Sequence, residues 1–175
     1  MRIIAGKWRS RILDVPSGRD TRPTADRVRE AWMSMLHPDL QDSRVLDLFA
    51  GSGALGLEAL SRGAATATFV EWTPAALRVL KANIDRLGAS QQATVVRGDA
   101  LHFIENLAPL SYDLALADPP YGQQLAAQLA SRFLERPFAQ ALWLEHGADE
   151  VLPGMEQAHT RRYGATAITR LVATQ

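Results

Sequence analysis

The chain has 175 residues, 47% of them hydrophobic, and its 19 basic and 19 acidic residues give a formal net charge of zero. This length suits one domain with a sizeable core, and the absence of cysteine excludes disulfides and thiolate metal sites. No apolar run is long enough for a signal-peptide core or a membrane span, so we expect a cytoplasmic protein that binds no membrane.

The charge is unevenly distributed along this neutral chain. Residues 1–30 contain eight basic and four acidic side chains, a net charge of +4, which leaves −4 for the remainder. A basic end on a neutral protein can hold phosphate groups. A general bias toward arginine would explain the ratio of arginine to lysine, but it would not explain this clustering.

The N-terminal residues 1–20 are expected to extend a single domain, residues 1–175, and within them residues 2–5 and 11–15 predict a small β-hairpin. Residues 26–36 have helical apolar spacing, with Thr24 as the expected N-cap of this leading helix. The leading helix belongs to the core of the domain, residues 21–175.

Strand and helix patterns then alternate with short connections, which predicts an α/β fold with a mostly parallel sheet covered on both faces. Thr73-Pro74 begins a helix that ends at Gly88, and residues 123–134 form another helix. Residues 142–144 are expected in a fifth strand. The last segments, residues 157–162 and 165–173, predict a closing hairpin with an antiparallel strand.

A glycine-rich turn follows the first strand of this core. The strand at residues 45–49 is followed by Gly51-Ser52-Gly53 and then by a helix at residues 54–62. Gly51, Gly53 and Gly56 match the pattern that holds a pyrophosphate in dinucleotide enzymes, but this pattern alone is weak. Asp47 would repel a pyrophosphate and attract a cation or a hydroxyl group. S-adenosylmethionine has an ammonium group, a sulfonium and ribose hydroxyls without phosphate, so we expect this cofactor.

Two further acids follow neighbouring strands. Glu71 ends the strand at residues 67–70, at the spacing from Asp47 at which an acid reaches ribose hydroxyls. Asp99 follows the strand at residues 95–98 and is expected to accept from the adenine amino group, with Trp72 and Leu101 beside the ring. The predicted cofactor site comprises Asp47, Phe49, Ala50, Gly51, Ser52, Gly53, Glu71, Trp72, Asp99, Ala100 and Leu101.

A second loop, Asp118-Pro119-Pro120-Tyr121, follows an apolar run at residues 112–117. The prolines end the strand, because neither can donate a ladder hydrogen bond, and they stiffen the loop. Asp118 and the Pro119 carbonyl then become fixed acceptors, and Tyr121 offers a flat face to a base. These parts suit methylation of an exocyclic amino group, although a Pro-Pro turn that merely ends a strand is the alternative for this segment taken alone.

Four segments together, residues 2–13, 21–30, 46–63 and 118–121, resemble the RsmD family, bacterial 16S ribosomal RNA guanine-N2 methyltransferases. The glycine loop indicates only a class I methyltransferase, and the Asp-Pro-Pro-Tyr loop narrows this to amino methylation. The Arg-Pro-Thr segment at residues 22–24 is the specific part. The resemblance implies a Rossmann-like, S-adenosylmethionine-dependent fold with a seven-stranded sheet.

The resemblance also implies a reaction and a partner. One methyl group would pass to the N2 amino group of a guanine in 16S ribosomal RNA, within the assembled or assembling small ribosomal subunit. Asp118, Pro119, Pro120 and Tyr121 would hold the flipped base, and we expect the enzyme to act as a monomer. The predicted RNA-binding residues are Arg2, Lys7, Arg9, Arg11, Arg22, Thr24, Arg27 and Arg29.

The histidines lack the spacing of a metal site or a catalytic triad, so we expect no metal. All four are expected at the surface or in loops, at positions His37, His102, His146 and His159.

Other functions share parts of this pattern. DNA adenine and protein glutamine methyltransferases would share the cofactor site and the proline loop, but neither explains the Arg-Pro-Thr segment. A non-catalytic RNA-binding assembly factor on a methyltransferase fold is a different class, and the intact acids speak against it. Asp47 and the prolines disfavour a dehydrogenase.

Overall fold

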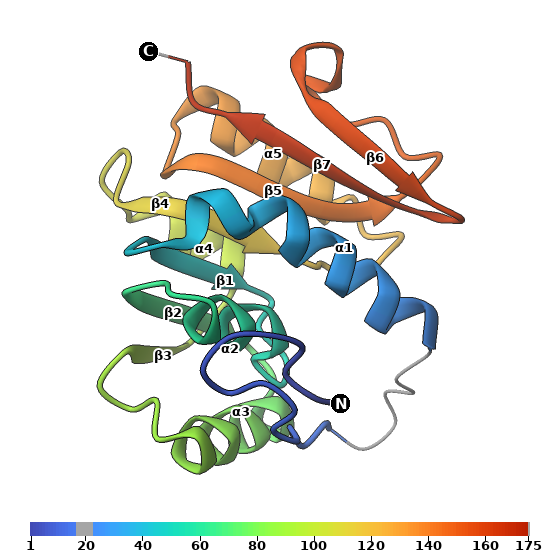
Figure 1. Cartoon of the computed structure of the whole chain (residues 1–175). Coiled ribbons are helices and arrows are strands. Elements are labelled where there is room, and N and C mark those ends of the chain that lie inside the picture. Colours follow the sequence, from blue (N-terminus) through green and yellow to red (C-terminus); the bar gives the residue numbers. More distant parts are fainter. Residues whose placement is uncertain (17–22, 175) are drawn as a thin grey trace.

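The computed structural model describes residues 1–16 and 23–174, with the backbone alone for residues 23–26. Its centre is a seven-stranded sheet with the order β3-β2-β1-β4-β5-β7-β6. Strands β1 to β5 are parallel, and β7 lies antiparallel between β5 and β6 (Figure 1). The strands are β1 (Arg44–Leu48), β2 (Thr66–Glu71), β3 (Ala93–Arg97), β4 (Tyr112–Ala117), β5 (Ala139–Gly147), β6 (His159–Tyr163) and β7 (Thr166–Val172).

Helices cover both faces of the sheet, as the alternating pattern predicted (Figure 1). One hydrophobic core joins one face of the sheet to α1, α2 and α3, and a second joins the opposite face to α4 and α5. The helices are α1 (Pro23–Leu40), α2 (Ala54–Ser61), α3 (Pro74–Leu87), α4 (Ala100–Glu105), α5 (Leu125–Glu135) and the short 3-10 helix η1 (Met155–Gln157).

Local sequence signals account well for α3. Thr73 is its N-cap, Pro74 takes the first helical position, and Gly88 ends it with a left-handed φ of 66°. The apolar side chains at helical spacing are buried, and Leu80, Ile84 and Leu87 belong to the core on one face of the sheet. The closing hairpin is also confirmed, with β6 and β7 joined at Gly164.

Several predicted boundaries differ from the structure. Helix α1 begins at Pro23, so Thr24 lies within the first turn and is not the N-cap, and the helix continues through Pro38 to Leu40. Strand β5 is longer than residues 142–144, because residues between 139 and 144 pair with β4 and residues 141–147 pair with β7. The N-terminal hairpin is reduced to one antiparallel bridge between Arg2 and Ile12.

The two arms of the N-terminal segment, residues 1–14, exchange a few backbone hydrogen bonds, and buried polar side chains hold the segment on the domain. The Glu58 carboxylate accepts the backbone N–H groups of Ile4 and Ala5 at 2.7 and 3.0 Å. The Asn83 amide accepts from the N–H of Asp14 at 2.9 Å and donates to its carbonyl at 3.0 Å. Glu58 and Asn83 are both fully buried, so this segment packs against α2 and α3 as part of the domain.

His146 corrects another expectation, because it is fully buried in β5. Its Nε2 lies 2.7 Å from the Thr169 hydroxyl and its Nδ1 lies 2.9 Å from the Gly147 carbonyl oxygen. Burial lowers the pKa of His146, so the neutral ring is favoured. Across residues 1–16 and 23–174, no helix has the length and apolarity needed to cross a lipid bilayer.

Candidate active site

The loop after β1 has a backbone that its glycines make possible. Phe49 and Gly53 have φ angles of 62° and 83°, and the Gly53 N–H donates to the Ala50 carbonyl at 2.7 Å. A Cβ at Gly53 would lie 2.5 Å from a methyl carbon of Leu80. A non-glycine residue such as Phe49 at positive φ is unusual, and such residues occur often at functional sites.

Asp47 lies beneath this loop, not at the mouth of the strand where the sequence placed it. Its carboxylate is buried, and Oδ2 accepts the Gly56 N–H at 2.8 Å. A Cβ at Gly56 would lie 2.4 Å from the Phe69 ring, so this glycine serves the packing of α2 on β2. Burial raises the pKa of Asp47 to about 7, with smaller increases from Asp118 and Glu71 and an opposing effect of the Gly56 hydrogen bond.

Glu71 connects two loops at the end of β2. Its two carboxylate oxygens accept the N–H groups of Gly51 and Thr73, at 2.8 and 2.7 Å. These hydrogen bonds fix the orientation of the carboxylate and leave further lone pairs on both oxygens. An orientated carboxylate of this kind is suited to accept from a pair of ligand hydroxyls.

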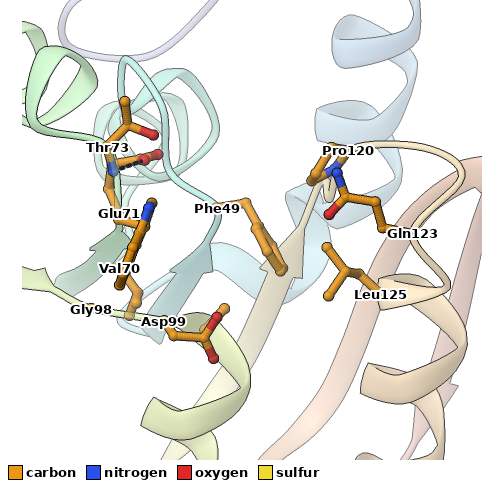
Figure 2. A pocket seen from close by; sticks show the side chains of 11 residues that line it. Phe49, Val70, Glu71, Thr73, Gly98, Asp99, Pro120, Gln123 and Leu125 are labelled. Carbon is orange, nitrogen blue, oxygen red and sulfur yellow. Dashed lines mark hydrogen bonds between the residues drawn. The ribbon is translucent and has the colours of Figure 1, made fainter.

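A cavity of about 250 Å³ lies at the C-terminal ends of the parallel strands, where ligands bind in open α/β sheets. Figure 2 shows the Phe49 side chain between Glu71 and Asp99 on one side and Pro120 and Leu125 on the other. None of the described residues that line it is a lysine or an arginine. The lining residues are Phe49, Val70, Glu71, Trp72, Thr73, Gly98, Asp99, Ala100, Pro120, Gln123 and Leu125.

The structure brings together part of the predicted cofactor site. Phe49, Glu71, Trp72, Asp99 and Ala100 line the cavity, and the Trp72 side chain is 72% exposed. Asp99 also caps α4, because its Oδ1 accepts the His102 N–H at 2.9 Å. The remaining predicted residues do not line the cavity; they are Asp47, Ala50, Gly51, Ser52, Gly53 and Leu101.

The Asp-Pro-Pro-Tyr loop borders the same cavity. Pro120 lines it, Asp118 and Tyr121 are exposed, and Pro119 is buried. The Tyr121 hydroxyl lies 3.0 Å from Glu145 Oε1, to which it donates, and 3.0 Å from the Thr166 hydroxyl. The proline loop is thereby tied to β5 and β7.

Sequence reasoning missed Glu145. Burial raises its pKa to about 7, and the negative charge of Asp118 adds to the increase. Burial and the Glu145 charge also raise the pKa of Tyr121 to about 12, so its hydroxyl remains a donor. The available signal was an acid at the end of an apolar strand, the same signal that identified Glu71 and Asp99.

The predicted RNA-binding residues divide into three groups. Arg2, Lys7, Arg9, Arg11 and Arg27 are exposed. Arg29 is only 7% exposed and its Nη2 donates to the Arg2 carbonyl at 2.9 Å, so it takes part in N-terminal packing rather than in an exposed surface. Arg22 and the Thr24 side chain lie outside the described residues. Within the described part of the chain, no group of three or more potential ligands is arranged for a metal ion.

This sheet order and the cavity at the strand ends define the class I methyltransferase fold. The family model described as "Conserved hypothetical protein 95" matches residues 1–171, and the chain belongs to this family. The resemblance to the RsmD proteins is confirmed by relatives named ribosomal RNA small subunit methyltransferase D.

Two such relatives and one solved structure illustrate the similarity. The relative from Escherichia coli K12 is 45% identical over 125 residues, which cover 71% of this chain but only 62% of that protein. The relative from Haemophilus influenzae is 42% identical over 137 residues, covering 77% and 71%. A solved structure of yhhF from E. coli, described as a candidate methyltransferase, has a TM-score of 0.84 at 34% identity and covers 100% of this chain and 99% of that one.

Proposed function

We propose that this protein transfers a methyl group from S-adenosylmethionine to the N2 amino group of a guanine in the 16S ribosomal RNA of the small ribosomal subunit. One observation carries the proposal: Glu71 and Asp99 line the same cavity as Pro120 of the Asp-Pro-Pro-Tyr loop. A cofactor held by these acids would therefore lie beside the loop that we expect to hold the target amino group. The names of the RsmD relatives support ribosomal RNA of the small subunit as the substrate.

The residues around the cavity fit this cofactor. The acids Glu71 and Asp99 and the lack of basic side chains among the described lining residues favour a positively charged ligand with hydroxyl groups over a pyrophosphate. Glu71 would accept from the ribose hydroxyls, and the exposed Trp72 ring offers a face to adenine. When bound, the cofactor supplies an electrophilic methyl group on a sulfonium.

The chain's own residues would act on the nucleophile. The lone pair of a guanine N2 amino group is delocalised into the ring, so the group is a poor nucleophile until acceptors hold both of its hydrogens. Asp118 and the Pro119 carbonyl would provide these acceptors, and Tyr121 would stack on the flipped base. Positioning and electrostatic stabilisation are the main catalytic effects.

The direct test is transfer of a tritiated methyl group to small ribosomal subunits, followed by mass spectrometric mapping of the modified nucleotide. We expect N2-methylguanine at one position with the wild-type protein. The Asp118→Asn variant should lose more than about 100-fold in kcat, because a carboxamide replaces one acceptor by a donor. Its affinity for S-adenosylhomocysteine, measured by calorimetry, should change little.

The control is Asp149→Asn, at an exposed aspartate in the turn that follows β5. It should match the wild-type protein in both measurements. Wild-type activity in Asp118→Asn would contradict the assignment of Asp118, and methylation of DNA or protein instead of ribosomal RNA would contradict the proposed substrate.

A further inference from the structure

A second basic surface lies far along the sequence from the N-terminal residues that were expected to contact RNA. A cavity of about 380 Å³ opens between α1 and the edge of the sheet formed by β6 and β7, and we call it the hairpin groove. Figure 1 shows α1 running across the front of the sheet, with β6 and β7 at one edge. The groove is lined by Met35, Trp143, His159, Arg161 and Arg170.

At the floor of the hairpin groove, the guanidinium of Arg170 lies against the aromatic ring of Trp143. The Arg170 guanidinium lies 5.4 Å from the centre of the Trp143 ring, and its Nη2 forms an ion pair with Asp39 at 3.1 Å. Trp143 Nε1 and Arg170 Nε are buried and have no hydrogen-bond partner within the described residues. Their uncompensated N–H dipoles add to the positive potential of the floor.

Arg161 forms the wall of the hairpin groove. It is exposed, and its Nε lies 3.4 Å from His159 Nε2. Among the described residues no carboxylate forms an ion pair with Arg161, although residues 31–175 together carry a net charge of −4. An exposed guanidinium that forms no ion pair with a described carboxylate is suited to bind phosphate oxygens.

The register of the sheet places this wall near the candidate active site. Ile168 lies opposite Glu145 on one side and opposite Arg161 on the other, so the three residues form a row across β5, β7 and β6. Two strand spacings separate Glu145 from Arg161, roughly 10 Å between their backbones. Because residues opposite one another point to the same face, Arg161 lies on the side of the sheet where Glu145 holds Tyr121.

We propose that the hairpin groove binds the backbone phosphates of the nucleotides that flank the target guanine, with Arg161 as the main contact. The inference rests on the proposed function, since it takes the substrate to be RNA. The stacked Arg170 contributes positive charge at the floor, while its ion pair with Asp39 reduces that contribution. Phosphate contacts of this kind set the position of the RNA without reading its sequence.

The test measures binding of the fluorescently labelled protein to small ribosomal subunits over a series of KCl concentrations. Arg161→Gln should weaken binding roughly three- to tenfold and make the plot of log affinity against log salt shallower by about one unit. Arg161→Lys keeps the charge and should retain the wild-type slope. The matched control is Arg78→Gln, an exposed arginine on α3, which should bind like the wild type.

Two further measurements separate this inference from the proposed function. The kcat of Arg161→Gln at saturating subunits and its affinity for S-adenosylhomocysteine should equal those of the wild type. If Arg161→Gln has the same salt dependence of binding as the wild type, the proposed phosphate contact in the hairpin groove is wrong, even if methyl transfer is intact. If the wild type binds subunits but transfers no methyl group, the proposed function fails. The salt dependence of Arg161→Gln then still shows whether the hairpin groove binds phosphates. Failure of the wild type to bind subunits would overturn both.

Discussion

At the scale of single residues, the buried position of Asp47 destabilises its ionised carboxylate. Burial raises the pKa of this carboxylate to about 7, whereas the pKa of an aspartate in an unfolded chain is about 3.9. The folded protein therefore binds a proton more tightly than the unfolded chain does. The free energy of unfolding should decrease as the pH rises from about 4 to about 7, and it should change little from this cause above that range.

Asp47→Asn tests this cost. The carboxamide oxygen can still accept the Gly56 N–H, but no charge is buried. We expect the variant to exceed the wild type in free energy of unfolding by a few kcal/mol at pH 8, and the gain should disappear toward pH 4. Urea denaturation at several pH values measures it, with the exposed Asp85→Asn as the control. A loss of stability that is equal at both pH values would contradict a buried, charge-sensitive Asp47.

Glu145 and Asp118 form a second electrostatic pair, and the pH dependence of methyl transfer should reflect it. Because each negative charge disfavours the other, the pair is expected to lose its last proton with an apparent pKa near the value of about 7 for Glu145. Below that pH, one of the two carboxyl groups, Asp118 or Glu145, carries a proton, and the negative charge beside the amino group is smaller. The kcat of the wild type should therefore rise between pH 6 and pH 8.

Glu145→Gln should flatten this profile, because it removes the carboxyl group whose pKa is about 7. Tyr121→Phe is the matched control, since it removes the hydroxyl that binds Glu145 but keeps both carboxylates. It should retain the rise in kcat with pH, shifted toward higher pH because the Tyr121 hydrogen bond lowers the pKa of Glu145, and it should raise the KM for small subunits. A profile that is unchanged in Glu145→Gln would assign the titration to another group.

At the scale of elements, the N-terminal segment and the glycine loop are joined through one side chain of α3. Asn83 donates to the carbonyls of Asp14 and Ser52, at 3.0 and 2.9 Å, and it also accepts the Asp14 N–H. The segment is therefore a support for the glycine loop after β1 rather than a free arm. This connection depends on residues 69 and 31 positions apart in the chain, which no local pattern indicates.

Asn83→Ala should show the coupling. It leaves the part-buried backbone N–H and carbonyl of Asp14 and the buried carbonyl of Ser52 without their partner, and we expect a loss of roughly 1–3 kcal/mol in the free energy of unfolding. The affinity for S-adenosylhomocysteine should also decrease, because the Ser52 carbonyl no longer anchors the loop. The control is the exposed Asn106→Ala, which loses one hydrogen bond to the His102 carbonyl. Unchanged cofactor affinity in Asn83→Ala would disprove the coupling.

At the scale of the whole molecule, binding at the cavity between β2, β3 and the proline loop should stabilise the entire domain. A ligand present at 100 times its Kd adds about 2.7 kcal/mol to the free energy of unfolding. For a domain of this size, S-adenosylhomocysteine should therefore raise the Tm by roughly 5–10 °C in differential scanning calorimetry.

The Glu71→Gln variant should show a much smaller rise in Tm. Its amide nitrogen would face the N–H of Gly51 or Thr73, so the carboxylate geometry and one acceptor are lost. The exposed Glu156→Gln is the control and should shift like the wild type. A wild-type shift in Glu71→Gln would place the ligand elsewhere.

The sequence by itself determined the order and type of the helices and strands. The signals for them are the spacing of apolar residues, the capping residues and the turn residues, and all of these lie within short stretches of the chain. It also predicted Glu71 and Asp99 from their position at strand ends, and Asp118 from the Pro-Pro-Tyr loop that follows its strand. The predicted start of helix α1 lies too far along the chain, because the prediction places Thr24 just before the helix. In the structure, Pro23 and Thr24 both belong to its first turn. Proline and threonine are common both just before a helix and in its first turn, so the local sequence could not decide between these two positions.

Only the tertiary structure decided which of these side chains meet. The sequence placed Asp47 near the end of one strand and Asp99 directly after another, yet Asp47 is buried under the loop and Asp99 is exposed beside the cavity. Glu145 joins Tyr121 only because β5 pairs with β4, and the hairpin groove exists only because β7 brings β6 next to α1. Burial, long-range pairing and the proton affinities that follow from them depend on contacts between distant parts of the chain.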